Sequence, residues 1–300
     1  MDMNTAFFPW DAIERDEFDR PIALSAWRGR APARASAYRL LVPIDGSAAA
    51  VSVVRVAAQM ADRLPEAELH LLNVQVCPSS AEDALEREGL HDTSAARGAL
   101  DAMGATYCLH LVAGTPAETI RAFARTHAVA EIVMGSHGGG DLERLLIGSV
   151  AMDVAEKADV PVTLVKAGDR AGRLPADWID WLLPCDGSAS ALRAADYLAR
   201  RLAARGGDPR IHVLSVQPVP DDAAAACGKA RATLEAAGLA CETHVRAGDP
   251  AARILELAAE LGCGHIVMGT RGLSLLGKLM LGSVSGAVAR AAHLPLTLIP

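Results

Sequence analysis

An internal repeat constrains this chain more than any other feature of its sequence. Residues 132–165 (IVMGSHGGGDLERLLIGSVAMDVAEKADVPVTLV) align without a gap with residues 266–299 (IVMGTRGLSLLGKLMLGSVSGAVARAAHLPLTLI), at an offset of 266 − 132 = 134. An earlier block, LVPIDGS at 41–47, matches LLPCDGS at 182–188, at an offset of 182 − 41 = 141. Two copies of one unit within 300 residues predict two similar domains in tandem.

Each copy alternates short apolar runs with helical stretches. Near-continuous apolar strands separated by helices indicate a parallel sheet that is covered on both faces. The sequence therefore predicts an α/β fold of two tandem doubly wound domains, each a five-stranded parallel sheet in the order 3-2-1-4-5 flanked by helices. The two offsets differ by seven residues, which predicts a shorter second helix in the second half. In the first half the expected strands are 38–45, 68–76, 107–113, 131–135 and 161–166, and the expected helices are 47–64, one within 81–103, 116–127 and 149–157.

The repeat also sets the expected domain boundaries. We expect an N-terminal extension at 1–36, a first domain at 37–168, a linker at 169–177 and a second domain at 178–300. Glycine, proline and charged residues after the first repeat favour the linker. The extension contains five aromatic residues, so two interpretations remain open: a disordered tail, or an arm docked on the domains.

Composition excludes several classes of protein. The formal charge of −7 argues against a nucleic-acid surface, which would carry a basic excess. No apolar run approaches the roughly 18 to 20 residues that span a bilayer, and no basic segment precedes a hydrophobic one at the N-terminus. The six cysteines form no C-x-x-C pair, which is typical of reduced thiols. We expect a cytoplasmic protein with neither a nucleic acid nor a membrane as partner.

A glycine frame follows the fourth expected strand of each half and precedes a helix. In a doubly wound sheet this position lies at the carboxyl edge, where strand order reverses and ligands bind. Free backbone N–H groups and the positive end of a helix dipole favour an anion such as phosphate there. The frame occurs twice with identical spacing, as Gly135, Gly138, Gly148 and Ser149 and again as Gly269, Gly272, Gly282 and Ser283.

An aspartate ends the first expected strand of each half. In the order 3-2-1-4-5, strands 1 and 4 flank the switch point, so Asp45 should face Gly135 and Asp186 should face Gly269. A carboxylate there can accept a hydrogen bond from a ribose hydroxyl or an exocyclic amine. The alternative role is that of an N-cap or turn residue of the following helix.

These residues resemble the ATP-binding branch of the universal stress protein family. The resemblance rests on G-x-x-G-x(9)-G-[ST], the Pro-x-Asp of strand 1 and the β/α order, and it covers residues 38 to 300. It implies an adenine-nucleotide site in each half, for ATP or for ADP or AMP, with Mg²⁺ as an accompanying ion. It also implies pairing of the fifth strands, here within one chain as a pseudo-dimer, and a further homodimer stays open. The nucleotide-binding residues that it implies are Pro43, Asp45, Val74, Met134, Gly135, Gly138, Gly148, Ser149, Val150, Pro184, Asp186, Val216, Met268, Gly269, Arg271, Gly272, Gly282, Ser283, Val284 and Ser285.

The expected function is that of a stress-response binding or regulatory protein. Slow ATP hydrolysis remains an alternative, although the chain lacks the G-x-x-x-x-G-K-[ST] loop and an obvious base beside the γ-phosphate. An interaction scaffold with one or both sites degenerate is a third interpretation. Between its bounding glycines the first loop carries net charge −1 and the second +2, which predicts tighter ATP binding in the second half.

Four histidines recur at matching strand positions of the two halves. Descent from a common repeat explains His70 with His212 and His110 with His244, so we expect core or edge residues and no metal site.

Overall fold

The structure, a computed structural model, describes residues 9–17, 21–29, 38–76, 84–137, 147–166, 180–205, 208–217, 220–271 and 281–300. Several sequence expectations fall outside these ranges. They are Gly138, Gly272, the linker 169–177 and the loop charges other than Arg271.

The two domains follow the expected alternation of strands and helices. The first contains β3 (Tyr38–Pro43), α1 (Ala49–Asp62), β4 (Ala67–Gln75), α2 (Ala84–Asp92), α3 (Ser94–Ala102), β5 (Tyr107–Ala113), α4 (Pro116–Thr126), β6 (Glu131–Gly135), α5 (Ser149–Lys157) and β7 (Val162–Val165). The second contains β8 (Asp180–Pro184), α6 (Ala189–Arg205), β9 (Arg210–Val216), α7 (Pro220–Ala236), β10 (Cys241–Arg246), α8 (Pro250–Glu260), β11 (His265–Gly269), α9 (Ser283–Ala291) and β12 (Leu296–Ile299). The seven-residue difference lies where it was expected, because 31 residues separate β4 from β5 and 24 separate β9 from β10 (31 − 24 = 7). The single 17-residue α7 replaces two helices, α2 and α3, of 9 residues each.

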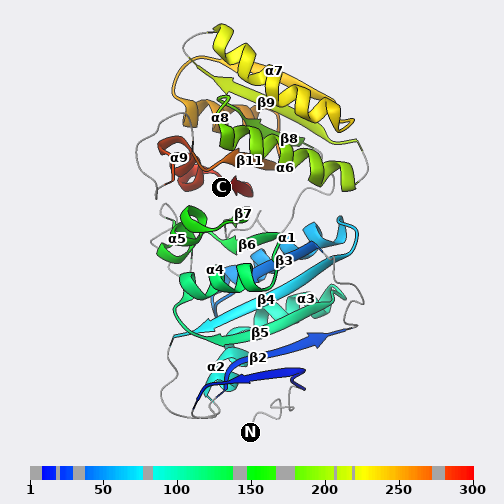
Figure 1. Cartoon of the computed structure of the whole chain (residues 1–300), viewed down its shortest axis with the longest axis vertical. Helices are drawn as coiled ribbons and strands as arrows, with labels where there is room; N and C mark the ends of the chain where they lie inside the picture. Colours follow the sequence, from blue (N-terminus) through cyan, green and yellow to red (C-terminus); the bar gives the residue numbers. More distant parts are fainter. Residues whose placement is uncertain are drawn as a thin grey trace.

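All described strands form one sheet, in the order β1-β2-β5-β4-β3-β6-β7-β12-β11-β8-β9-β10. Within it, β5-β4-β3-β6-β7 and β10-β9-β8-β11-β12 are parallel sets, which confirms the 3-2-1-4-5 order twice. The fifth strands β7 and β12 pair antiparallel, with Thr163 opposite Thr297, which confirms the pairing expected within one chain. Figure 1 shows the domains stacked along the long axis with β7 at their junction.

The sheet separates two hydrophobic cores. Successive side chains of a strand point to opposite faces, so Leu40 and Val42 of β3 join one core and Leu41 joins the other. The first core lies under α1, α3, α6 and α7, and the second under α4, α5, α8 and α9. Each core contains residues of both domains, so their packing is continuous across the junction.

A buried chain of hydrogen bonds crosses the junction. Thr163 Oγ1 donates to Glu131 Oε1 at 2.5 Å and lies 2.7 Å from Thr297 Oγ1, which lies 2.6 Å from His265 Nε2. A carboxylate only accepts, so the donors run from His265 Nε2 through the two threonines to Glu131. This direction fixes the protonated nitrogen of the neutral His265 ring.

Helix α6 of the second domain reaches the same carboxylate. Glu131 Oε2 accepts from Arg201 Nη1 at 2.7 Å, Tyr197 Oη at 3.0 Å and Tyr38 Oη at 3.1 Å. The Glu131 and Arg201 side chains are 0% and 5% exposed. Burial opposes the charged guanidinium, but the Glu131 carboxylate outweighs it and raises the pKa of Arg201. The pair therefore joins the domains as a buried ion pair.

A hairpin from the N-terminal extension widens the sheet. Strands β1 (Ala12–Arg15) and β2 (Pro21–Arg28) pair with each other, and β2 pairs antiparallel with β5. The docked-arm interpretation is therefore the right one for the described part of the extension. On β2 the buried Leu24 and Ala26 alternate with half-buried residues, whereas Ile22, which precedes the first residue paired with β5, is exposed. Over the same described ranges, no helix is long and apolar enough to cross a membrane.

We expect Leu24→Asp to release this hairpin from β5, because a carboxylate cannot be buried in the core without a partner. Amide hydrogen exchange along β5 should accelerate by at least about tenfold, since β2 protects that edge. Ile22→Asp is the matched control, because its carboxylate would reach water. Equal exchange in the two variants would contradict the docking that we describe.

Candidate functional site

A cavity of about 390 Å³ lies at the carboxyl edge of the first-domain sheet, between the ends of β3 and β6. Its volume falls within the range of small-molecule sites. The helices α1, α4 and α5 complete its wall. The cavity is lined by Pro43, Ile44, Asp45, Ser47, Ala49, Ala50, Val53, Leu72, Val74, Pro116, Ile120, Met134, Gly135, His137, Gly148, Ser149, Val150 and Ala151. This set includes every described residue of the first half that the sequence predicted for the site.

Asp45 stands exposed at the rim, two residues beyond the end of β3. Its Oδ1 accepts a hydrogen bond from the Ser47 backbone N–H at 3.1 Å and another from the Ser47 hydroxyl. Ala48, and not Asp45, is the N-cap of α1, so of the alternative roles the N-cap is wrong and the turn residue is right. The carboxylate is held in place by the turn and remains at the cavity wall.

The glycine frame closes through the backbone. Gly148 N donates to the Ser136 carbonyl at 2.8 Å, which brings the start of α5 back to the end of β6. Gly148 is the N-cap of α5 and offers no side-chain cap, so the first N–H groups of the helix lack an intrahelical partner at the cavity wall. A Cβ at Gly135 would lie 3.2 Å from the His137 carbonyl oxygen, so a side chain there would crowd the loop.

Helix α4 supplies part of the wall that the sequence reasoning missed. Pro116 and Ile120 line the cavity opposite the glycine frame. The sequence signal for Pro116 is a further repeated block, AGTPA at 113–117, which matches AGDPA at 247–251. His137 also lines the cavity, half-buried, with Nδ1 2.9 Å from Ser136 Oγ.

The second domain repeats the backbone closure. Gly282 N donates to the Thr270 carbonyl at 2.9 Å, and α9 begins at Ser283. The hydroxyl of Ser285 is buried and donates to the carbonyl oxygens of Thr270 at 2.8 Å and Gly282 at 3.0 Å. Ser285 was predicted as a ligand contact, but its hydroxyl hydrogen is directed at the loop backbone. Of the other predicted residues here, Pro184, Met268 and Gly269 are buried, Asp186, Val216, Gly282 and Val284 are half-buried, and Arg271 and Ser283 are exposed.

Helix α6 packs more closely on its loop than α1 does. A Cβ at Gly269 would lie 2.7 Å from the Ser190 backbone carbon, whereas no α1 backbone lies within 4 Å of a Cβ at Gly135. The nearest α1 atom there is Val53 Cγ2, at 3.5 Å. The position that matches Val53 at offset 141 is Ala194, which is small enough to let α6 approach. The hydroxyls of Ser188 and Ser190 donate to the Arg271 carbonyl beside this contact.

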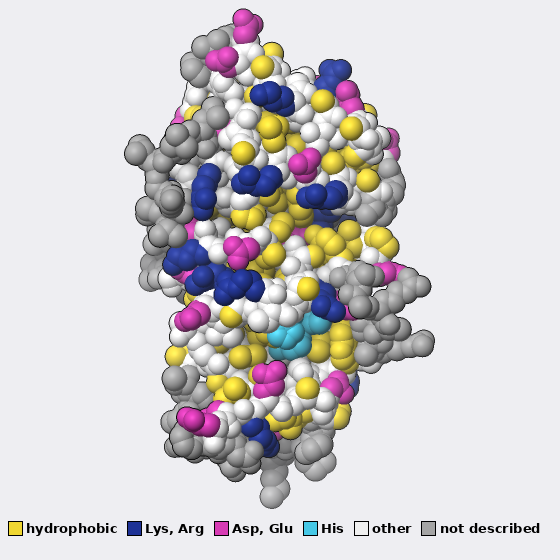
Figure 2. All heavy atoms as spheres, in the orientation of Figure 1, with side chains coloured by type: hydrophobic (Ala, Val, Ile, Leu, Met, Phe, Trp, Pro, Cys, Tyr) yellow, Lys and Arg dark blue, Asp and Glu magenta, His cyan; other side chains and the backbone are white. Residues whose placement is uncertain are grey.

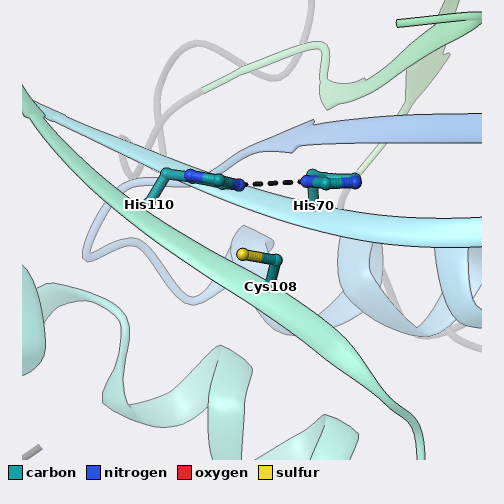
Figure 3. A group of neighbouring side chains, drawn as sticks. All are labelled: His70, Cys108 and His110. Carbon is teal, nitrogen blue, oxygen red and sulfur yellow. Dashed lines mark hydrogen bonds between the residues drawn. The ribbon is translucent and has the colours of Figure 1, made fainter. Parts of the chain in front are cut away.

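Two groups of side chains have the composition of a metal site. One is His70, Cys108 and His110, drawn in Figure 3, and the other is His212, Glu242 and His244. Within each group the potential ligand atoms lie within 4.8 Å of one another. The sequence showed that these histidines recur, but not that each pair meets across neighbouring strands.

Cys185, next to Asp186, is buried, and burial raises the pKa of its thiol to about 11. A protonated buried thiol is a packing residue. The described cysteines are all free thiols.

The fold and the cavity define a class: a tandem, doubly wound α/β protein with a ligand-sized cavity at a topological switch point. The family model for the universal stress protein family matches residues 38–166 and 181–300. The chain therefore belongs to the universal stress protein family.

Two universal stress proteins are similar to this chain over most of its length. A universal stress protein of Mycolicibacterium smegmatis is 27% identical over 299 residues, covering 88% of this chain and 98% of the relative. The crystal structure of a universal stress protein from Archaeoglobus fulgidus superposes with a TM-score of 0.70 at 23% identity, covering 88% of this chain and 98% of that one. A universal stress protein solved in complex with cAMP is 29% identical over 40% of this chain and 95% of its own, with a TM-score of 0.35.

Proposed function

We propose that this protein binds an adenine nucleotide in the cavity of its first domain and acts as a regulatory binding protein in a stress response. One observation carries the proposal: Asp45, the Gly135 turn and the start of α5 converge on one cavity of about 390 Å³. An anionic group suits the uncapped helix start, because its N–H groups and dipole favour negative charge. The ligand thus has an anionic end next to Gly148 and Ser149.

The rest of the wall suits a nucleoside. Leu72, Val74 and Ile120 form an apolar surface against which a flat base can pack. Asp45, exposed at the rim, can accept a hydrogen bond from a ribose hydroxyl or an exocyclic amine. ATP, ADP and AMP share these groups, and a Mg²⁺ ion would accompany the polyphosphate.

The net charge of the loops and the space beside the glycine frames give opposite rankings of the nucleotide affinity of the two domains. The loop charges favour the second domain for a polyanion. The space beside the glycine frame favours the first, because Ser188 and Ser190 occupy the corresponding region of the second. Steric overlap excludes a ligand group from the space it needs, whereas a difference in net loop charge only changes an attraction that salt weakens. We therefore propose the first domain as the tighter site.

The test is a nucleotide titration with paired variants. Denatured purified protein is first analysed by chromatography for bound nucleotide, and nucleotide-free protein is then titrated with ATP, ADP, AMP and cAMP. Gly148→Val should weaken ATP binding by at least about tenfold, because its side chain enters the anion end of the cavity. Gly282→Val, the matched change in the second domain, should leave the tighter binding step intact. A larger loss from Gly282→Val would support the charge-based ranking instead.

Two outcomes would replace the proposal. No bound nucleotide, together with no ATP-dependent shift in melting temperature, would favour an interaction scaffold. Steady-state phosphate release faster than about one per second would place the protein among enzymes.

A further inference from the structure

We propose that each domain carries a transition-metal site on strands 2 and 3 of its sheet, and that His70, Cys108 and His110 bind zinc in the first. His70 lies on β4, and Cys108 and His110 lie on β5. His70 is the register partner of Cys108, and His110 is the partner of Leu72. Residues paired across parallel strands, and residues two apart on one strand, point to the same face, so all three side chains share a face.

The distances fit a tetrahedral ion. His70 Nδ1 lies 3.0 Å from His110 Nε2, and the Cys108 sulfur lies within 4.8 Å of a ring nitrogen of each histidine. Zinc binds imidazole nitrogen at about 2.0–2.1 Å and thiolate at about 2.3 Å, which places two nitrogens about 3.3 Å apart. The observed separation therefore needs only a small adjustment. Figure 3 shows a nitrogen of each ring directed at the other ring, with Cys108 below them in this view.

A carboxylate orients the first histidine. His70 Nε2 lies 3.2 Å from Glu68 Oε2, and Arg39 Nε holds that same oxygen at 2.8 Å. A carboxylate only accepts, so the neutral His70 ring is protonated on Nε2 and its Nδ1 lone pair faces the cluster. Histidine ligands of metals usually have such a partner. In the metal-free protein this lone pair accepts the His110 Nε2–H, so zinc binding would require His110 to shift its proton to Nδ1.

The two imidazoles are uncharged near neutral pH, whereas the thiol must lose its proton to bind a metal. Burial lowers the pKa of His70 and lowers that of His110 to about 3, so both imidazoles are neutral near pH 7. Burial raises the pKa of the Cys108 thiol to about 12. Zinc binding would therefore replace the thiol proton with a Zn–S bond, and one proton would pass to solvent. Figure 2 shows histidine side chains at the surface of the first domain. His70 and His110 themselves are 7% and 8% exposed.

The second domain repeats the arrangement with a different third ligand. His212 on β9 is the register partner of Glu242 on β10, and His244 follows two residues later. His212 Nδ1 lies 3.2 Å from His244 Nε2 and 3.6 Å from Glu242 Oε2. The Glu242 side chain is 67% exposed. Because a solvent-exposed carboxylate replaces the buried thiolate, we expect this site to bind a transition metal more weakly than the first.

The second domain also places a carboxylate next to its first histidine, but this carboxylate comes from a different strand. In the second domain Asp180 Oδ1 lies 3.6 Å from His212 Nε2, and Arg210 holds Asp180 at 2.6 Å. The acid and the arginine have exchanged strands between the halves: Arg39 precedes Glu68 on the next strand, but Asp180 precedes Arg210. Both halves nevertheless place a carboxylate against the outer nitrogen of the same histidine. Descent of the repeat alone would not restore this contact after the exchange.

The test uses Co²⁺ as a spectroscopic substitute for Zn²⁺ in full-length, untagged protein treated with chelator. We expect a thiolate-to-cobalt charge-transfer band that saturates near one equivalent, with release of about one proton, and loss of the band when Zn²⁺ is added. Cys108→Ser, which is nearly isosteric, should abolish the band and the proton release. A band that is absent, or that survives Cys108→Ser, would overturn the first-domain site.

The second site and the orienting residue have their own variants. His244→Gln should leave the band unchanged and reduce bound metal from about two equivalents to one; unchanged metal content would overturn the second-domain site. Glu68→Gln should retain the band but weaken Zn²⁺ binding by about 10–100-fold. His293→Gln, an exposed histidine after α9, is the control that should change neither quantity. Melting temperatures in chelator verify that each variant is folded, and His110→Gln replaces Cys108→Ser if that variant is not.

Discussion

Arg201→Met should lower the free energy of unfolding by about 3–5 kcal/mol, because it leaves the Glu131 carboxylate buried without its charged partner. The two side chains meet at 2.7 Å and are almost completely enclosed by both domains. Tyr38 and Tyr197 still donate to the carboxylate in the variant, but neutral hydroxyls do not neutralise a buried charge. The loss should appear in urea-induced unfolding.

A double variant tests whether the loss of stability comes from the unpaired charge of Glu131 or from lost packing contacts of Arg201. Arg201→Met combined with Glu131→Leu should recover most of the loss, because replacing a buried ion pair with apolar groups is often neutral. Arg200→Met is the matched control: it is the preceding residue of α6, it is exposed, and it should change stability by less than about 0.5 kcal/mol. If Arg201→Met proved as mild as Arg200→Met, the ion pair would not stabilise the junction.

Acid should destabilise the junction through His265. This side chain is fully enclosed, and burial, with Arg201 adding repulsion, lowers its pKa well below 6.5. In the unfolded chain the ring binds a proton below about pH 6.5, but in the folded protein it stays neutral. Its contribution to stability is therefore complete above pH 6.5 and is lost as pH falls toward the folded-state pKa. Between pH 6.5 and the folded-state pKa the loss approaches about 1.4 kcal/mol per pH unit.

The measurement is the free energy of unfolding between pH 7.5 and 5, with chelator present. Its slope against pH gives the number of protons taken up on unfolding. His265→Gln retains a polar group near Thr297 but cannot titrate, so the slope should decrease by about one proton. His293→Gln is exposed and should leave the slope unchanged. An unaltered slope in His265→Gln would show that the ring is protonated in the folded protein.

Local pattern and repeat were sufficient to predict most of the fold. Alternation of apolar runs with helical stretches indicates parallel strands, and the repeat requires both halves to share them. The topology then places the ends of strands 1 and 4 together, so Asp45 and Gly135 were predicted to meet across some ninety residues. The docking of β2 was not predictable, because its alternating side chains fit an edge strand anywhere.

The rest of the candidate site depends on distances between elements. Ile120 lines the cavity because α4 packs on β4 next to it. Strand register brings His70 to His110, and a shift of one residue would turn one ring to the opposite face.

The sequence by itself determined the two domains, their strand order, the glycine frames and the aspartates beside them, because these depend on spacing and on rules of parallel topology. Only the tertiary structure decided how the two copies differ. A Val53 methyl carbon lies next to Gly135 in the first copy, whereas the backbone of Ser190 lies next to Gly269 in the second. It also brought together Glu131 and Arg201, because a contact between distant residues depends on how side chains of different sizes pack, which no local pattern encodes.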